Sequence, residues 1–350
     1  MSIALITGSN GLIGSESVAF FANKGFDILG IDNNFRKFFF GYEGGVEDNL
    51  HKIISSIKKY NHFDVDIRNM LQLEKIFKKY KNRIDVIIHT AAQPSHDWAK
   101  SNINLDFQVN AIGTLNLLNL TRKYCPEAAF IFTSTNKVYG DNPNKFEFVE
   151  NSTRWELKKK DKNFDGIDEK MSLDNCLHSF FGTSKAYADL ATQEFGKNCG
   201  LKTVCFRAGC ITGPNHTGVE LHGFISYILK AFINQKTYNI FGYKGKQVRD
   251  NLHSRDLINC FWEFFKKPSK GEVYNVGGGR QSNCSILEVI YYLENKFKKK
   301  FKKKFFKKAR SGDHIWYITD MSKFKKNYPN WKQEFDIKKI LDEQIDNFHK

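Results

Sequence analysis

Short runs of apolar residues alternate with longer helix-like segments along the first part of the chain. The runs have the length that is typical of buried strands. Parallel strands need crossover connections, and these normally carry helices on both faces of the sheet. We therefore predict an α/β fold built on a doubly wound parallel sheet. Its predicted strands are residues 3–7, 27–31, 86–90, 130–134 and 203–207.

The alternation becomes irregular after about Gly209, where loops interrupt the pattern. A strand-like run at residues 273–276 and an apolar helix at residues 286–297 follow, so we expect the two parts of the chain to exchange segments. We predict that residues 1–207 form the sheet domain, with a returning segment near residues 252–276. Residues 208–350 then form a smaller C-terminal lobe.

The chain is basic, with 54 Lys and Arg residues against 38 Asp and Glu residues and a formal net charge of +16. Its densest basic block is residues 297–308, where phenylalanines are interleaved with lysines. We expect these phenylalanines to be buried and the lysines to be solvated, and we do not expect a nucleic-acid surface. A basic surface also attracts small metabolites that carry phosphate.

Length and composition exclude several classes of protein. With 350 residues, 41% of them hydrophobic, the chain can bury a large core. Its sequence has no uncharged apolar run of the roughly 18 residues that span a bilayer and no basic leader, so we expect a soluble cytoplasmic protein without a membrane partner. Its seven cysteines form no CxxC pair and no cluster with zinc spacing. We therefore predict reduced thiols and no metal site.

A glycine loop with the spacing GxxGxxG, residues 8–14, lies between the first predicted strand and an apolar helix. Glycines permit a tight turn and a close approach of the backbone to a pyrophosphate, whose charge is favoured by the exposed amides at a helix N-terminus. Asp32 ends the second predicted strand, 18 residues beyond Gly14. Its carboxylate can accept hydrogen bonds from an adenosine ribose and repels a 2′-phosphate, although Arg36 and Lys37 lie close by. The combination predicts a Rossmann domain that binds NAD.

Further motifs resemble the extended short-chain dehydrogenase/reductase family, which includes the nucleotide-sugar epimerases and dehydratases. The resemblance covers nearly the whole chain and rests on the glycine loop, Asp66-Ile67, Ala91-Ala92-Gln93, Asn110 with Gly113-Thr114, residues 134–140, Lys185 and Val248-Arg249-Asp250. It implies NAD as the cofactor, a nucleotide sugar as the substrate, and a homodimer in which the helices that carry Asn110 and Lys185 pack against their copies. The expected NAD-binding residues are Gly8, Asn10, Gly11, Leu12, Ile13, Gly14, Asp32, Asn33, Asp66, Ile67, Ala91, Ala92, Gln93, Asn110, Thr133 and Lys185.

Within the family, residues 134–141 and the insertion that carries residues 153–156 are most similar to the subfamily of CDP-paratose 2-epimerases, also called CDP-tyvelose epimerases. The resemblance therefore favours a CDP-sugar. Residues 93–98 and 209–218 are less ordinary for this subfamily, which leaves the base and the sugar open. A 4,6-dehydratase or a 4-epimerase is the second hypothesis. Dehydratases usually carry an acidic pair just after a motif Ser or Thr, where this chain has Asn136-Lys137.

The resemblance implies a reaction in which NAD takes a hydride from a sugar carbon and returns it to the opposite face of the keto sugar. The family's base is the tyrosine of a YxxxK motif, and a Ser or Thr fixes the reacting hydroxyl. Thr135 matches the Ser or Thr and Lys185 matches the lysine, but Phe181 occupies the tyrosine position. The spacing of four places Phe181 and Lys185 on one helical face, yet a phenyl ring cannot transfer a proton.

Three interpretations of Phe181 stay open. In the first, another group takes the proton, and His178 is the first candidate because it lies three residues upstream with a pKa suited to neutral pH. His178 can instead be a loop or capping residue, and Cys176 and Lys137 are more distant candidates. Tyr187 is discounted because it lies about 200° from the motif lysine on the helix wheel. In the other two interpretations, the tyrosine was changed to trap a substrate, or the chain binds NAD and a nucleotide sugar without catalysis.

Arginines are the expected contacts of the substrate's diphosphate, because a guanidinium forms paired, charge-assisted hydrogen bonds with phosphates. By the resemblance, Arg249 and Arg310 take this role. The insertion at residues 142–173 lies between the two catalytic motifs and is expected to pass the mouth of the pocket. The expected substrate-binding residues are Gln93, Asn136, Arg154, Asn215, Arg249 and Arg310.

Overall fold

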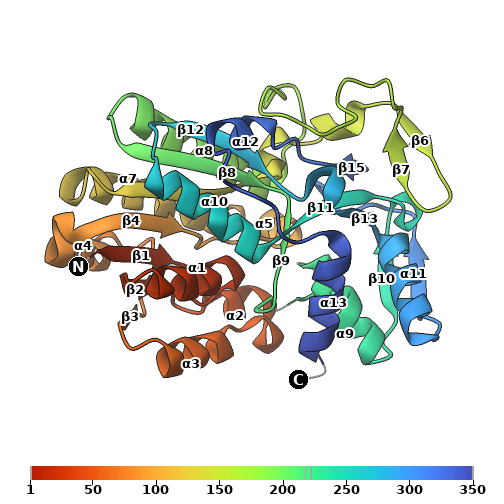
Figure 1. Cartoon of the computed structure of the whole chain (residues 1–350), viewed down its shortest axis with the longest axis horizontal. Coiled ribbons are helices and arrows are strands. Elements are labelled where there is room, and N and C mark those ends of the chain that lie inside the picture. Colours follow the sequence, from red (N-terminus) through yellow and green to blue (C-terminus); the bar gives the residue numbers. More distant parts are fainter. Residues whose placement is uncertain (1, 217, 221–222, 349–350) are drawn as a thin grey trace.

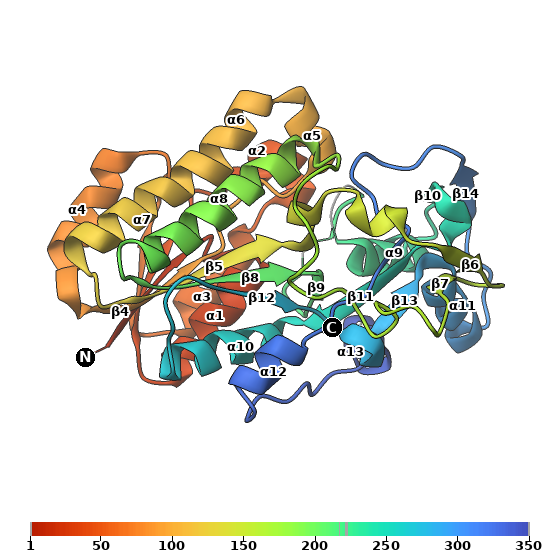
Figure 2. The same ribbon diagram turned by 90° about the horizontal axis from the view of Figure 1, so that it is seen from above.

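The computed structural model describes residues 2–216, 218–220 and 223–348. Its main element is a seven-stranded parallel sheet with the strand order β12-β8-β5-β4-β1-β2-β3 (Figures 1 and 2). The strands are β1 (Ile3–Thr7), β2 (Asp27–Ile31), β3 (Tyr60–Phe63), β4 (Ile84–His89), β5 (Ala129–Thr135), β8 (Lys202–Ala208) and β12 (Glu272–Val276). The order reverses between the neighbours β1 and β4, which is the topology of a Rossmann fold. The predicted fold class is confirmed.

Helices cover both faces of this sheet, and Figure 2 shows the two layers. One face carries α1 (Leu12–Asn23), α3 (Glu47–Ser56), α10 (Ser254–Lys266) and α12 (Ser322–Asn327), and the other carries α4 (Met70–Tyr80), α7 (Gly113–Tyr124) and α8 (Ser179–Lys197). The strands alternate between these two apolar clusters: in β1, Ile6 belongs to the first cluster and Leu5 to the second. Successive side chains of a strand point to opposite faces, so a sheet covered on both sides needs continuous apolar runs.

Three short helices lie in the segments that follow β2 and β4. They are α2 (Phe35–Phe40), α5 (His96–Ser101) and α6 (Ile103–Phe107). A π-helical segment, Gln108–Ile112, joins α6 to α7, and a single turn of 3-10 helix, Asn136–Tyr139, follows β5.

A smaller lobe lies beside the sheet, on the right in Figure 1. Its apolar core is formed by α9 (Phe224–Ile233), α11 (Ile286–Phe297), α13 (Ile337–Phe348), β10 (Tyr238–Phe241) and Phe301, and β14 (Lys303–Phe306) pairs with β10 at its edge. A further small sheet joins β9 (Cys210–Thr212), β11 (Val248–His253), β13 (Asn283–Ser285) and β15 (Trp316–Tyr317). The insertion forms the hairpin of β6 (Phe148–Glu150) and β7 (Trp155–Leu157).

The chain returns from the small lobe to the main sheet at α10 and β12, and again at α12. β12 pairs in parallel with β8, and α10 packs against α1, so the segment near residues 252–276 lies against the sheet. The helix expected at residues 286–297 is α11. Where the two domains divide stays a prediction.

The basic block at residues 297–308 agrees only in part with the expected burial. Phe301 is buried in the core of the small lobe, but Phe305 is 53% exposed and Phe306 is 36% exposed. Both exposed rings belong to β14, which pairs only with β10 in a two-stranded sheet. Such a sheet offers less apolar cover than the main sheet does. None of the described helices is long and apolar enough to cross a membrane, and all seven cysteines are free thiols.

Candidate active site

The glycine loop wraps so tightly around the start of α1 that two glycines have no room for a side chain. A Cβ on Gly14 would lie 1.9 Å from the carbonyl oxygen of Gly8, and a Cβ on Gly8 would lie 2.7 Å from the backbone nitrogen of Ala91. Gly8 also has a φ of +67°, which side chains disfavour. Gly11 precedes α1 without a side-chain cap, and the first turn of α1 carries no acidic residue. The backbone amides of this helix N-terminus are therefore available to an anion.

Asp32 follows β2 and lies beside this loop. Its Oδ2 accepts a hydrogen bond from the backbone N–H of Asn10 (3.0 Å), and its Oδ1 accepts one from that of Asn34 (2.8 Å). The two bonds fix the carboxylate and leave lone pairs on both oxygens for ribose hydroxyls. Burial raises the pKa of Asp32. Asn33 Nδ2 donates to Asp66 Oδ2 (3.4 Å), so the residues predicted to hold the adenosine lie together.

Gln93 and Asn110 belong to a buried polar network. The Gln93 backbone N–H donates to Asn110 Oδ1 (2.9 Å), and Gln93 Nε2 donates to Asp106 Oδ1 (2.6 Å). Asn110 Nδ2 also donates to Ser184 Oγ (3.1 Å), which ties the loop after β4 to α8. The Gln93 side chain is fully buried and does not line the cavity described below. The structure therefore argues against the predicted substrate contact of Gln93, because its amide already bonds within the protein.

Lys185 reaches from α8 to the carboxyl end of β5. Its Nζ donates to the carbonyl oxygen of Thr133 (2.7 Å) and lies 4.1 Å from the centroid of the Phe132 ring. Burial lowers the pKa of Lys185 to about 8. Thr135, at the end of β5, accepts a hydrogen bond from the backbone N–H of Lys137 at its Oγ1 (3.2 Å). The strand end and the helix thus bring Thr135 and Lys185 to the same place.

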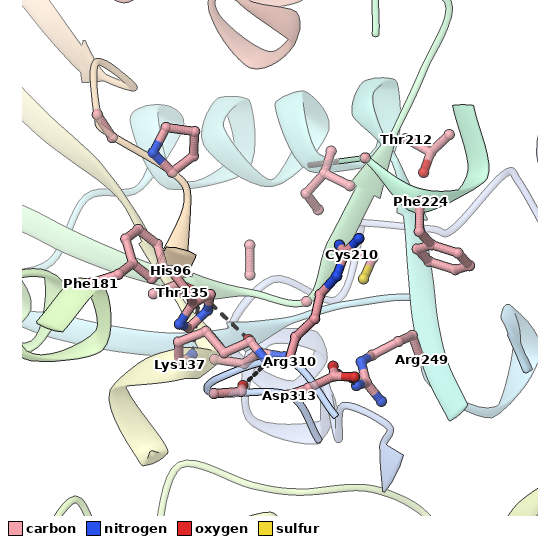
Figure 3. Close-up of a pocket in the computed structure, with 18 of the residues that line it drawn as sticks. His96, Thr135, Lys137, Phe181, Cys210, Thr212, Phe224, Arg249, Arg310 and Asp313 are labelled. Atoms are coloured by element: carbon pink, nitrogen blue, oxygen red, sulfur yellow. Dashed lines mark hydrogen bonds and ion pairs between the residues drawn. The ribbon is translucent and has the colours of Figure 1, made fainter. Parts of the chain in front are cut away.

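A cavity of about 450 Å³ opens between the sheet and the small lobe (Figure 3). Predicted NAD-binding residues line one side of it: Leu12, Ile13, Ala92, Thr133 and Lys185. Thr135 and Phe181 line it as well, and so do three predicted substrate-binding residues, Asn136, Arg249 and Arg310. One continuous cavity therefore joins the cofactor residues to the candidate catalytic and diphosphate-binding residues.

Phe181 lies in the first turn of α8 and is 6% exposed. Its ring packs edge-on against His96, with the two ring centroids 4.8 Å apart. His96 Nδ1 is hydrogen-bonded to Ser179 Oγ (2.7 Å). Burial, aided by the charge of Lys137, lowers the pKa of His96 to about 3, so its imidazole is neutral.

His178 does not line this cavity. α8 begins at Ser179, and His178 precedes it with its Nε2 2.7 Å from the carbonyl oxygen of Leu173 and 3.4 Å from Cys176 Sγ. The ring therefore faces the insertion. The structure argues against His178 as the base, because the helix does not extend back far enough to bring its ring to Phe181.

Arg249 and Arg310 enter the cavity from different segments, β11 and the loop after β14. The Arg249 guanidinium contacts the Asp313 carboxylate and the carbonyl oxygen of His314. Arg310 donates to the carbonyl oxygen of Glu220 (2.7 Å), and its guanidinium lies 4.6 Å from the centroid of the Phe241 ring. Figure 3 shows both arginine side chains at the cavity. Two guanidinium groups at one cavity suit a diphosphate.

The other two predicted substrate residues, Arg154 and Asn215, lie outside the residues that line the cavity. Arg154 forms an ion pair with Glu288 of α11 (2.5 Å) and a hydrogen bond with Asn283 Oδ1 (2.8 Å). Asn215 Nδ2 donates to Glu16 Oε1 of α1 (3.0 Å). Each side chain bonds to another part of the protein, and Arg154 fastens the insertion to the small lobe, so their contact with a substrate stays a prediction that the cavity does not support.

Two residues that line the cavity were not identified from the sequence as main candidates. His96 was not a candidate, and Lys137 was a distant one. The available signal was the unusual segment at residues 93–98, which contains His96, the first residue of α5. Among the described residues, no group of His, Cys, Asp and Glu could hold a metal ion.

Comparisons with known proteins agree with this geometry. The sequence model described as "NAD dependent epimerase/dehydratase family" matches residues 4–277. The CDP-paratose 2-epimerase of Salmonella typhi is 31% identical over 349 residues, which cover 98% of each chain. A dTDP-glucose 4,6-dehydratase of Salmonella typhimurium is 28% identical over 296 residues, which cover 82% of this chain and 74% of the relative.

The fold is similar to that of solved structures across the whole chain. The UDP-glucose 4-epimerase of Thermus thermophilus, solved in complex with NAD, superposes with a TM-score of 0.78 at 22% sequence identity. The match covers 99% of both chains. The likeness therefore includes the small lobe as well as the main sheet.

Proposed function

The chain belongs to the NAD-dependent epimerase/dehydratase family, and on that premise we propose that it is a nucleotide-sugar epimerase of the CDP-paratose 2-epimerase type. The observation that carries the proposal is the single cavity that Lys185 and Thr135 share with Arg249 and Arg310. The full-length identity of 31% to a CDP-paratose 2-epimerase supports the choice of a CDP-sugar.

The cofactor of the family is NAD, and the residues of the glycine loop fit it. The space that Gly8 and Gly14 leave, the exposed amides of α1 and the fixed carboxylate of Asp32 suit a pyrophosphate and its ribose. Bound NAD supplies the hydride acceptor and donor of the reaction. Thr135 orients the reacting hydroxyl, and Lys185 holds the nicotinamide end of the cofactor.

Two alternatives follow from particular residues. Phe181 supports a protein that binds NAD and a nucleotide sugar without turnover, because its ring occupies the position of the family's base. A 4,6-dehydratase is less well supported, because Asn136 and Lys137 stand where dehydratases carry acidic residues.

The test is incubation of the NAD-loaded protein with CDP-, UDP-, GDP- and dTDP-sugars, with product stereochemistry followed by NMR. We expect epimerisation of a CDP-sugar by the unchanged protein. Phe181→Tyr is the matched variant: activity that appears only in this variant shows that a base has been lost. Tight binding of both ligands without turnover in either form contradicts the enzyme hypothesis.

We also propose a homodimer formed through the helices that carry Asn110 and Lys185. Five apolar side chains on this side of the molecule are between 37% and 49% exposed: Ile103, Phe107, Ile112, Tyr187 and Leu190. Burial of such a patch stabilises an interface. Leu190→Lys should turn a dimer into a monomer in light-scattering measurements. Leu71→Lys, on the exposed side of α4, is the control and should leave the dimer intact.

A further inference from the structure

Lys137 lines the cavity and lies in the turn directly after Thr135. It is also close to His96, whose ring packs against Phe181. Figure 3 shows it beside His96 and Thr135. Because Phe181 replaces the family's tyrosine, the usual proton acceptor of the site is missing. We propose that Lys137 is the residue that transfers the proton in this active site, an inference that rests on the proposed epimerase function.

The hydrogen bonds of Lys137 suit a group that gains and loses a proton. Its Nζ lies 2.9 Å from the carbonyl oxygen of Gly312 and 3.4 Å from His314 Nδ1. His314 Nε2 lies 2.8 Å from the carbonyl oxygen of Gly140, so Nε2 carries the ring proton and Nδ1 is an acceptor. Both partners of the amine therefore accept, and a neutral amine has two N–H groups to satisfy them.

Lys137 lines the cavity, so the proposal assigns the third direction around Nζ to the substrate. An ammonium places its third N–H there, and a neutral amine places its lone pair there. The two hydrogen bonds within the protein are the same in both states. The proton can therefore move between Nζ and a substrate oxygen without a rearrangement of the surrounding residues, which lowers the cost of the transfer.

Burial and the surrounding charges favour the neutral amine of Lys137. Burial comes first and the cation of Arg249 second, and together they lower the pKa of Lys137 to about 8. Asp313 and Cys210 act in the opposite direction, and because Asp313 and Arg249 form an ion pair their effects offset each other, which leaves burial as the main cause. His96 and His314 also face Lys137, and burial keeps the pKa of each below its usual range, so neither adds a positive charge.

The other basic groups at the site fit this step less well. His96 is a neutral imidazole whose low pKa makes it too weak a base to hold the proton. Lys185 bonds to the end of β5, among the residues that line the cofactor side. Lys137 lies instead near Arg249 and Asp313, on the side where a substrate diphosphate is expected.

The step balances in atoms and charge. Lys137 as a neutral amine takes the proton of a sugar hydroxyl: the O–H bond breaks and an N–H bond forms. The C–H bond of the same carbon breaks, and its hydrogen leaves with the electron pair to NAD, so the carbinol becomes a ketone. After the ketone presents its other face, the hydride returns to the carbon and the ammonium of Lys137 returns a proton to the oxygen.

The first arm of the test measures turnover of the nucleotide sugar that the unchanged protein epimerises. Lys137→Met should lower kcat by about 10²–10⁴-fold, the usual contribution of a general base, and should leave the affinities for NAD and nucleotide sugar within a few-fold. Adding Phe181→Tyr to Lys137→Met should restore much of the activity, because the tyrosine supplies a base. Lys100→Met, at an exposed lysine of α5, is the matched control.

The second arm needs neither cofactor nor substrate. The ligand-free protein is labelled with acetic anhydride at a series of pH values, and the acetylated peptides are quantified by mass spectrometry. Labelling of Lys137 should reach half its maximum near pH 8, whereas a free lysine peptide titrates at about pH 10.4. A curve for Lys137 that coincides with that of the peptide overturns the proposal.

Three outcomes of the first arm also overturn it: wild-type kcat in Lys137→Met, no recovery in the double variant despite normal ligand binding, or a similar loss in Lys100→Met. If the unchanged protein turns over none of the four nucleotide-sugar classes, the proposed function fails and the role of Lys137 fails with it. If turnover persists without Lys137, only the role of Lys137 fails.

Discussion

The glycine loop on the cofactor side and the substrate side of the cavity are built in different ways. The cofactor side depends on backbone: a loop with no room for side chains at Gly8 and Gly14, and a helix N-terminus with exposed amides. The substrate side depends on side chains, such as Arg249, Arg310 and Lys137, that come from separate segments. A backbone site tolerates little change, whereas a side-chain site can lose one group and take another. The cofactor side keeps the family pattern, and the substrate side has Phe181 in place of its base.

The largest effect on ligand affinity is expected on the cofactor side, from Gly14→Val. The new Cβ would lie 1.9 Å from the Gly8 carbonyl oxygen, so the loop must move. Overpacking costs about 1–3 kcal/mol or more, and we expect NAD affinity to fall by about a hundredfold in calorimetry. Ala19→Val, at an exposed residue of α1, is the control. Equal affinity in the two variants would contradict the close-packed loop.

The corresponding change on the substrate side is Arg249→Met. Loss of a charge-assisted hydrogen bond costs about 1.5–3 kcal/mol, which is roughly 10–150-fold in affinity. We expect this loss for the nucleotide sugar in calorimetry and an unchanged affinity for NAD. Arg122→Met, at an exposed arginine of α7, is the control. A loss of NAD affinity in Arg249→Met would mean that the two sides are not separate.

The pH dependence of catalysis distinguishes the two sides further. Lys137 must be a neutral amine to accept the proton, and burial lowers its pKa to about 8. The ratio kcat/KM should therefore rise about tenfold per pH unit below pH 8 and level off above it. Lys185 titrates in the same range, so the affinity for NAD is measured at each pH. If kcat/KM changes with pH only as far as the NAD affinity does, the titrating group is Lys185.

A smaller effect is expected from Arg154→Leu, which removes the ion pair between the insertion and Glu288. A partly buried, charge-assisted bond of this kind contributes about 1–3 kcal/mol to stability. The free energy of unfolding should fall by this amount, and KM for the nucleotide sugar should stay the same. A raised KM with unchanged stability would return Arg154 to the substrate site.

The smallest effect is expected from His178→Asn. The ring contacts Leu173 and Cys176 outside the cavity, so kcat should change by no more than about twofold. This follows because the ring bonds to the insertion and does not line the cavity. A large loss of kcat would reinstate His178 as the base.

The fold and NAD as the cofactor were predicted well because their signals are local. The strands at residues 3–7 and 27–31 are continuous apolar runs, and the glycine loop and Asp32 lie next to them. The substrate side was predicted less well because its contacts join distant segments. Arg154 meets Glu288 across 134 residues of sequence, and His96 meets Phe181 although no motif links them.

The direction in which a side chain points was harder to predict than the place of its residue in the fold. Gln93 stands where the motif places it, but its side chain turns into the buried network with Asp106. His178 lies close to Phe181 in sequence, but α8 begins only after it. A sequence pattern predicts the element or loop on which a residue lies, whereas the direction of its side chain depends on the neighbouring elements.

The most direct test of the central claim is NMR of the product formed in D₂O by the NAD-loaded protein from a CDP-sugar. Because the hydride leaves with the cofactor and returns to the same carbon, the account predicts an epimer that keeps its original hydrogen there. Deuterium at the epimerised carbon would show removal of that hydrogen as a proton, and it would contradict an epimerase that works by transient oxidation.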